Sequence, residues 1–164
     1  MSAKGLVVLT AKLTVMQHTF TKPVVVGAAI LDDATRPTQM LAARRKAPKS
    51  LAGYWEFPGG KVEPEETPTG ALVREIREEL GVEIEILEHI AAPSDAGWRL
   101  DNGMNMHVYT AIVRLGKPEP LIEHDRLEWA ALTASDLHEL EWIPADRLIL
   151  DAILTQLGGT NASA

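Results

Sequence analysis

The clearest periodicity in the chain lies in the segment TPTGALVREIREELG, residues 67–81. Apolar side chains recur there every three to four positions, which is the spacing of one face of an α-helix. Thr67 is a good N-cap residue, Pro68 suits the first helical turn, and Gly81 suits the C-terminal end. The pattern therefore predicts an amphipathic helix over these residues.

Short apolar segments on both sides of this helix predict a β-sheet. Residues 24–31 are β-branched and almost wholly apolar, which indicates a buried strand. Residues 39–43 are its expected hairpin partner, across a turn at 32–38 that contains Asp and Pro. Further strands are expected at 54–57, 82–86, 104–113 and 127–132, with a loop or hairpin at 92–103.

Two more helices complete the expected fold. One is short, at residues 135–140, and the last runs from about Pro144 to Leu157. Strands mixed with helices predict an α/β sandwich with a mixed sheet. The expected organisation is one domain at 22–158, with an N-terminal extension at 1–21 and a C-terminal tail at 159–164.

The polar face of the first helix is unusually acidic. On an ideal helix Glu79 lies beside the apolar stripe, and Glu75 and Glu78 follow within one arc. Like charges at this spacing repel one another. The ordinary explanation is that Arg74 and Arg77 neutralise them, as on many solvated helices. However, the acids crowd toward the core side while Arg77 points elsewhere, so the cluster is also a candidate cation site.

Composition limits the chemistry that this site could perform. The chain has 164 residues and no cysteine, which excludes disulfides and thiolate zinc sites. Clustered carboxylate oxygens suit Mg²⁺, with Mn²⁺ as a substitute. A formal net charge of -7 argues against a nucleic acid polymer as partner, and no apolar run could span a membrane. We expect a cytoplasmic monomer or homodimer that acts on a small molecule.

The acidic helix and the Gly-Gly turn before it resemble the Nudix box, G-x5-E-x7-R-E-U-x-E-E-x-G-U, where U is apolar. Every fixed position matches, over a window of 23 residues. The preceding WEFPGGKVEPEE resembles the MutT-like branch of this family, which includes CTP pyrophosphohydrolases and oxidised-nucleotide hydrolases. The resemblance covers residues 23–157, and the matching positions are Gly60, Glu66, Arg74, Glu75, Ile76, Glu78, Glu79, Gly81 and Val82.

The resemblance implies a fold and a reaction. The fold would be an α/β/α sandwich. The reaction would be metal-dependent hydrolysis of a nucleoside triphosphate to a monophosphate and pyrophosphate, a step in nucleotide-pool sanitation and DNA repair. Glu75, Glu78 and Glu79 would hold the metal, and Glu75 is a candidate to activate the water. The backbone carbonyl of Gly59 or Gly60 would be a further ligand.

Other implied roles fall outside the helix. Glu66 would act with Arg74, a residue of the catalytic helix, to fix the geometry between loop and helix. Glu123 resembles the extra metal carboxylate that many members bring from a later loop. Arg45, with Arg44 beside it, resembles the arginine that contacts phosphate.

Two more residues are candidates for contact with the substrate. Asp146 occupies the region where MutT-like enzymes place an Asn or Asp against the base, although an acid there could simply cap the last helix. His107 is either a wall of the substrate pocket or a structural histidine. His124 adjoins Glu123, so it could reach the water on the metal, but as an expected exposed loop residue it is favoured as a bystander.

Alternative functions remain at this point. The substrate could instead be a nucleotide sugar, ADP-ribose or a dinucleotide. The chain could also be a non-catalytic nucleotide-binding module, or a structural protein with an acidic helix. Because all the carboxylates of the box are present, the catalytic interpretation is favoured over the last two.

Overall fold

The computed structural model describes residues 23–158. The predicted extension at 1–21 and the predicted tail at 159–164 lie outside the described residues. Eight strands form one sheet: β1 (Val24–Leu31), β2 (Gln39–Arg45), β3 (Trp55–Glu56), β4 (Gly59–Lys61), β5 (Glu83–His89), β6 (Trp98–Arg99), β7 (Asn105–Leu115) and β8 (His124–Ala131). The helices described are α2 (Pro68–Leu80), α3 (Ala134–Glu139) and α4 (Pro144–Gly158).

The sheet is mixed, as predicted. Its main path runs β3-β2-β1-β7-β5, while β4 pairs with β1, β6 with β7, and β8 with β2. The pairing of β1 with β7 is parallel and the other pairings are antiparallel. The segment 92–103 contains β6, which forms the expected hairpin with β7. These features confirm the predicted α/β fold class.

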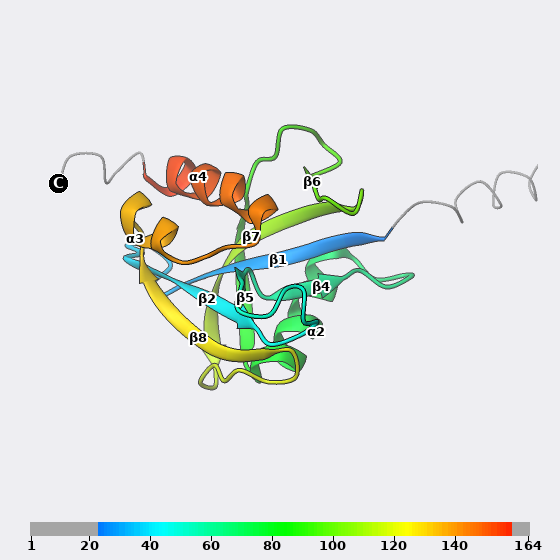
Figure 1. The fold of residues 1–164 in the computed structure, drawn as a ribbon, viewed down its shortest axis with the longest axis horizontal. Helices are drawn as coiled ribbons and strands as arrows, with labels where there is room; N and C mark the ends of the chain where they lie inside the picture. The colour runs from blue at the N-terminus through cyan, green and yellow to red at the C-terminus, as the bar shows by residue number, and fades with distance from the viewer. Residues whose placement is uncertain (1–22, 159–164) are drawn as a thin grey trace, which may run out of the picture.

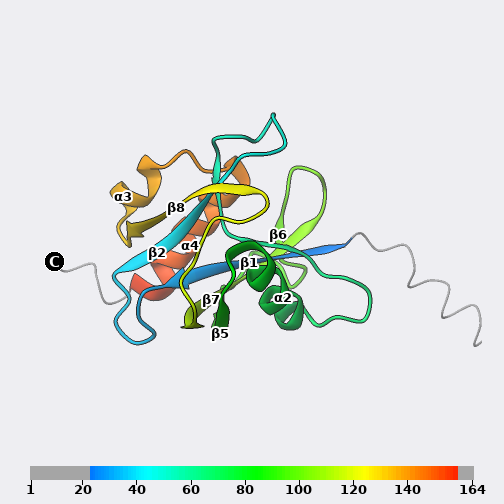
Figure 2. The same cartoon turned by 90° about the horizontal axis from the view of Figure 1, so that it is seen from below.

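The sheet lies between α2 on one face and α3 with α4 on the other (Figure 1). Figure 2 shows α2 from its own side of the sheet, in front of β1 and β7. Alternate residues of β1 enter the two cores, because successive side chains of a strand point to opposite faces. Val26 and Ile30 pack toward α2, whereas Ala29 and Leu31 pack toward α4. Burial on both faces explains why β1 is an almost unbroken apolar run.

Helix α2 forms as the sequence predicts. The Thr67 hydroxyl accepts a hydrogen bond from the Gly70 N–H at 3.1 Å, and Pro68 occupies the first turn. Gly81 ends the helix with φ 70°, a left-handed conformation that glycine adopts without strain. The apolar stripe Leu72, Ile76 and Leu80 is fully buried against the sheet.

Strand β4 is absent from the prediction, and it positions the Gly-Gly turn. Gly59 lies opposite Gly27 in the antiparallel pair with β1. A Cβ atom at Gly59 would lie only 1.9 Å from the carbonyl oxygen of Val26, so a side chain cannot fit there. The glycine therefore lets the turn lie directly against the central strand, beside α2.

Within residues 23–158, no helix is long and apolar enough to cross a lipid bilayer.

Candidate active site

Glu79 is the most deeply buried acid of α2, with 7% of its surface exposed. Its Oε2 atom accepts a hydrogen bond from the backbone N–H of Gly59 at 3.1 Å. Burial raises the pKa of Glu79 to about 8, and repulsion from Glu56, Glu75 and Glu123 adds to the shift. Among the described residues, no Lys, Arg or His forms an ion pair with this carboxylate.

Glu75 lies against the second glycine of the turn. A Cβ atom at Gly60 would be 2.4 Å from the carboxyl carbon of Glu75. Burial raises the pKa of Glu75, although its contact with Arg74 partly offsets this. The Gly-Gly turn thus contacts both Glu75 and Glu79, and it brings its own backbone into the acidic cluster.

Arg74 ties the loop before α2 to the helix. Its Nη2 and Nε atoms donate to the two carboxylate oxygens of Glu66 at 2.7 and 2.9 Å. Nη2 also donates to the carbonyl oxygen of Lys61 at 3.2 Å. The bidentate contact lowers the pKa of Glu66 to about 2. Glu66 and Arg74 are therefore brought together as expected, in a position that fixes the loop.

The acids of α2 differ in how they are neutralised. Arg74 Nη1 donates to Glu75 at 2.9 Å and to the more exposed Glu78 at 3.3 Å. Arg77 points away and pairs with Glu83 on β5. The ordinary ion-pair explanation thus holds for Glu75 and Glu78, but not for Glu79.

Arg45 approaches the cluster from β2. Its Nη1 donates to Glu56 at 2.9 Å, its Nη2 to Glu123 at 3.3 Å, and its Nε to the carbonyl oxygen of Ala47 at 2.9 Å. A guanidinium has five N–H groups, so two remain after these three contacts.

The neighbouring Arg44 makes different contacts. It donates to Asp125 at 2.9 Å and its guanidinium lies 5.9 Å from the centre of the Trp55 ring. Arg45, rather than Arg44, is therefore the arginine that the structure places among the acids.

Glu56 is a member of this group that the sequence analysis missed. Its Oε1 atom accepts hydrogen bonds from Arg45 and from His124 Nε2, each at 2.9 Å. The strand alternation could have revealed it, because Trp55 and Phe57 are buried in the core and Glu56 between them must face the other way.

His124 was expected to be an exposed loop residue, and this prediction is wrong. The side chain is buried, because β8 begins at His124 and not at residue 127. Arg44 pairs with Arg126 but Arg45 pairs with His124, so Asp125 is an extra residue in β8. Such a bulge changes the direction of the adjacent side chain, and here it turns His124 toward Glu56.

Asp146 and His107 lie in separate surroundings. Asp146 is 4% exposed, and its carboxylate accepts a hydrogen bond from the Phe57 N–H. Burial raises the pKa of Asp146 to about 7, with a contribution from the charge of Glu56. His107 instead bonds to His89 on β5 at 3.0 Å. Its strand neighbour Met106 packs in the core beside α4, so His107 lies on the opposite face of β7.

Comparison with known proteins identifies the family. The NUDIX domain profile matches residues 21–157, which is most of the chain. The chain belongs to the Nudix family. Nudix proteins hydrolyse diphosphate linkages in nucleotide compounds and generally use divalent metal ions, and this reaction agrees with the acidic site described above.

Relatives and a solved structure agree with the MutT-like resemblance. A Mycobacterium tuberculosis protein provisionally named 8-oxo-dGTP diphosphatase 2 is 37% identical over 85% of this chain and 93% of its own. The CTP pyrophosphohydrolase of Escherichia coli K12 is 36% identical over 81% of this chain and 93% of its own length. The solution structure of the E. coli ORF135 protein superposes with a TM-score of 0.65, at 34% identity over 86% and 94% of the two chains.

The Nudix acids have the right chemistry for a hard divalent cation. The available donors are carboxylate oxygens and the carbonyls of the Gly-Gly turn, which Mg²⁺ and Mn²⁺ prefer. Within residues 23–158, no three acidic or histidine side chains converge on a single point in this arrangement. Burial and the neighbouring acids disfavour the ionised form of Glu79, and a bound cation would favour that form.

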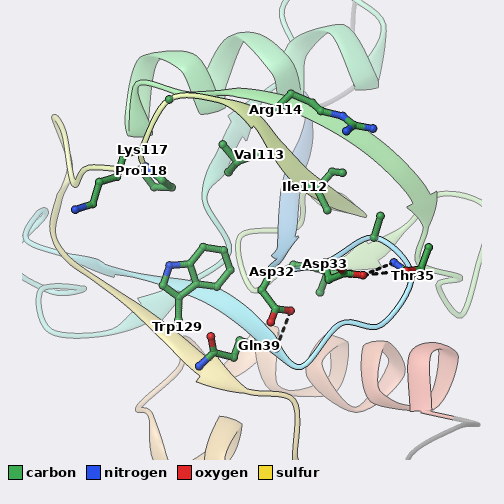
Figure 3. A pocket seen from close by; sticks show the side chains of 13 residues that line it. Asp32, Asp33, Thr35, Gln39, Ile112, Val113, Arg114, Lys117, Pro118 and Trp129 are labelled. Atoms are coloured by element: carbon green, nitrogen blue, oxygen red, sulfur yellow. Dashed lines mark hydrogen bonds between the residues drawn. The ribbon is translucent and has the colours of Figure 1, made fainter.

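A hollow of about 640 Å³ lies elsewhere on the Nudix fold, beside the turn between β1 and β2 (Figure 3). Trp129 forms one wall, and Lys117 lies near its rim. Asp32 and Asp33 border the hollow, but backbone and threonine groups of their own turn already bond their carboxylates. None of the predicted site residues lines this hollow.

Proposed function

We propose that the protein hydrolyses a nucleoside triphosphate to a nucleoside monophosphate and pyrophosphate, with Mg²⁺ or Mn²⁺ as the cofactor. The observation that carries this proposal is the buried carboxyl group of Glu79, which accepts a hydrogen bond from Gly59 and has no cationic partner among the described residues. It lies near Glu56 and Glu123, the two acids that Arg45 contacts. A divalent cation bound there would offset the negative charge of the polyphosphate. The names of the two bacterial relatives favour a cytidine or 8-oxoguanine nucleotide as substrate.

The metal would be held mainly by α2. Glu75, Glu78 and Glu79 would supply carboxylates, a carbonyl of the Gly-Gly turn would add an oxygen, and Glu123 would approach from the loop before β8. When bound, the cation would neutralise the polyphosphate and acidify the attacking water. Glu75 would accept the proton of that water at its carboxylate, which lies half-buried against Gly60.

Arg45 would hold the phosphates. Three of its N–H groups are occupied by Glu56, Glu123 and Ala47, and this fixes the plane of the guanidinium. The two remaining N–H groups can donate to phosphate oxygens, a geometry that arginine is well suited to provide. Glu66 and Arg74 would keep the loop in register with α2 and would not touch the reacting atoms.

Asp146 would read the base. Its carboxyl group is buried and accepts a hydrogen bond from the Phe57 backbone, which supports a role beyond capping the last helix. A pKa of about 7 lets the group exist in both forms near neutral pH. The ionised form accepts hydrogen bonds from the amino group of cytosine, or from N7–H and the amino group of 8-oxoguanine.

The test is a substrate panel read as pyrophosphate release. CTP, dCTP, 8-oxo-dGTP, dGTP and dTTP would be assayed with Mg²⁺, beside ADP-ribose, a nucleotide sugar and a dinucleotide. We expect turnover of a triphosphate, its loss with EDTA, and its recovery with Mg²⁺ or Mn²⁺. Exclusive turnover of a non-triphosphate would refute the substrate class, and turnover without metal would refute the mechanism.

Variants of the acids test the proposed ligands. Glu78→Gln and Glu79→Gln should each lower kcat by at least about tenfold at saturating Mg²⁺. Glu85→Gln is a matched control, because Glu85 is an exposed acid on β5 that is paired with Arg114. If Glu78→Gln and Glu79→Gln kept the kcat of the Glu85 variant, these acids would not be ligands. If no substrate were turned over by any form, a non-catalytic binding module would be the correct interpretation.

A further inference from the structure

His124 is a fully buried histidine beside the proposed site. Its Nε2 atom bonds to Glu56 Oε1 at 2.9 Å, while its Nδ1 atom is buried without a hydrogen-bond partner. A carboxylate accepts hydrogen bonds, so Nε2 is the donor in this contact. Burying a polar atom without a partner costs stability. The bond to Glu56 is therefore the clearest physical reason for a histidine at this position.

His124 and Arg45 are directly opposed across strands β8 and β2. Cross-strand partners project on the same face of a sheet, and here both donate to the same oxygen atom of Glu56. Glu56 is thereby held between two donors, and it holds one end of the Arg45 guanidinium in return. Glu123 and Ala47 hold the other sides of that group.

The turn before β8 shows a local backbone cost. Ile122 has φ 51°, although a β-branched residue rarely adopts the left-handed conformation. The Leu121 N–H donates to the Glu79 carbonyl at 3.0 Å, and the Glu123 carbonyl accepts from the Lys46 N–H at 2.9 Å. This turn thus ties α2 to the end of β2 and presents both Glu123 and His124 to the site.

We propose that His124 is a positioning residue, which orients the phosphate-binding Arg45 through the carboxylate of Glu56. The inference rests on the proposed function, because it assigns phosphate binding to Arg45. His124 itself would touch neither substrate nor metal. Without the Nε2 bond, Glu56 could rotate, and the two free N–H groups of Arg45 would lose their fixed direction.

Replacement by two amides separates this role from ordinary packing. The amide nitrogen of Gln reaches about as far as Nε2 of histidine, whereas that of Asn reaches only about as far as Nδ1. His124→Gln should therefore keep kcat/KM within about threefold of wild type, and His124→Asn should lower it roughly tenfold, as expected for loss of a hydrogen bond to a charged group. His124→Asn leaves its buried amide without Glu56 and should melt somewhat lower than His124→Gln, so both variants are assayed well below their melting temperatures.

A double-mutant cycle tests the route through Glu56. His124→Leu should lower kcat/KM about tenfold in the wild-type background, but less than about twofold in a Glu56→Ala background. The matched control is His138→Leu, because His138 also bonds a carboxylate, that of Asp151 at 2.8 Å. This pair joins α3 to α4 and does not include Glu56. This control should keep the wild-type kcat/KM.

A second readout does not require catalysis. Affinity for inorganic tripolyphosphate, measured by calorimetry with Mg²⁺, should fall severalfold in His124→Leu and His124→Asn but not in His124→Gln. Wild-type binding without turnover of any nucleotide would refute the proposed function while leaving this inference testable. Two results would refute the positioning role. One is an equal kcat/KM for His124→Gln and His124→Asn, and the other is the same fold loss of kcat/KM from His124→Leu in the wild-type and Glu56→Ala backgrounds.

Discussion

The buried carboxylate of Glu79 accepts a hydrogen bond from the backbone of Gly59, 3.1 Å away on the opposite side of the loop that precedes α2. This single bond joins the helix to the turn that lies against the central strand β1. A carboxylate in that position satisfies one N–H but remains next to three other acids. The arrangement has measurable consequences for stability, for the turn itself and for substrate binding.

The first prediction concerns the pH dependence of stability without metal. Burial raises the pKa of Glu79 to about 8 from 4.5, so the folded state holds this proton more tightly than the unfolded state. The resulting stabilisation is complete below about pH 4.5 and is lost as the pH rises through about 8. Glu79→Gln does not titrate, so it should raise the melting temperature in EDTA by several degrees at about pH 8.5 and much less at about pH 5.

Glu78→Gln provides the comparison for this experiment. Glu78 is about half exposed and is paired with Arg74, so its replacement should give no such gain. Asp146, with its pKa raised to about 7, contributes in the same direction between about pH 4 and 7. Equal melting curves for wild type and Glu79→Gln at both pH values would show that folding does not raise the pKa of Glu79.

The second prediction contrasts the two glycines of the turn. At Gly60 a Cβ atom would meet the end of the Glu75 side chain, which can move aside. Gly60→Ala should therefore fold with a melting temperature close to wild type but lose kcat, because Glu75 is displaced. At Gly59 a Cβ atom would meet the backbone of β1, so Gly59→Ala should lower the melting temperature strongly. Thermal melts and steady-state kinetics on both variants check this. If Gly60→Ala lost stability while Gly59→Ala kept it, the placement of the turn would be wrong.

The third prediction distinguishes the adjacent arginines. Arg45→Ala should raise KM for a triphosphate by at least about tenfold, because two charge-assisted hydrogen bonds are lost. Arg44 is held by Asp125 at the sheet surface, and Arg44→Ala should change KM by less than about twofold. Kinetics of the two variants under the same Mg²⁺ concentration decide between them. A larger effect at residue 44 would transfer the phosphate contact to that residue.

The fourth prediction concerns base preference and its dependence on pH. Above about pH 7 Asp146 is ionised and accepts hydrogen bonds, whereas below it the protonated group can also donate. Preference for cytidine or 8-oxoguanine nucleotides over thymidine nucleotides, measured as a ratio of kcat/KM, should therefore increase as the pH rises through about 7. Asp146→Asn should remove this dependence. If that variant kept wild-type ratios at every pH, the base would be read elsewhere, with His107 next to be tested.

Local signals in the sequence were sufficient for α2. The N-cap, the proline in the first turn, the apolar stripe and the glycine end are all neighbours in the chain, and each has a direct physical preference for its position. The central strands β1 and β7 were also predictable, because long apolar runs bounded by turn residues indicate buried strands. The acids of α2 could be grouped by helical geometry alone.

The parts that the sequence did not reveal depend on contacts between distant segments. Strand β4 has no side-chain alternation, since two of its three residues are glycine, and it exists because β1 pairs with it. The burial of His124 depends on the bulge at Asp125, which arises from the register between β2 and β8. Glu56 joined the site because Arg45 and His124 converge on it, a fact of tertiary structure.

The parallel pairing of β1 with β7 has a consequence for how the protein acquires activity. Eight consecutive residue pairs join β1 to β7, and β2 to β6 together with α2 lie between these two strands in the chain. Bringing such distant segments together costs loop entropy before any contact is gained, so folds with this connectivity fold slowly. During synthesis the Gly-Gly turn and α2 emerge well before β7 and His124. A chain released or cleaved before that point would carry the complete acidic helix, yet it would have neither the sheet that supports the helix nor the histidine beside Arg45.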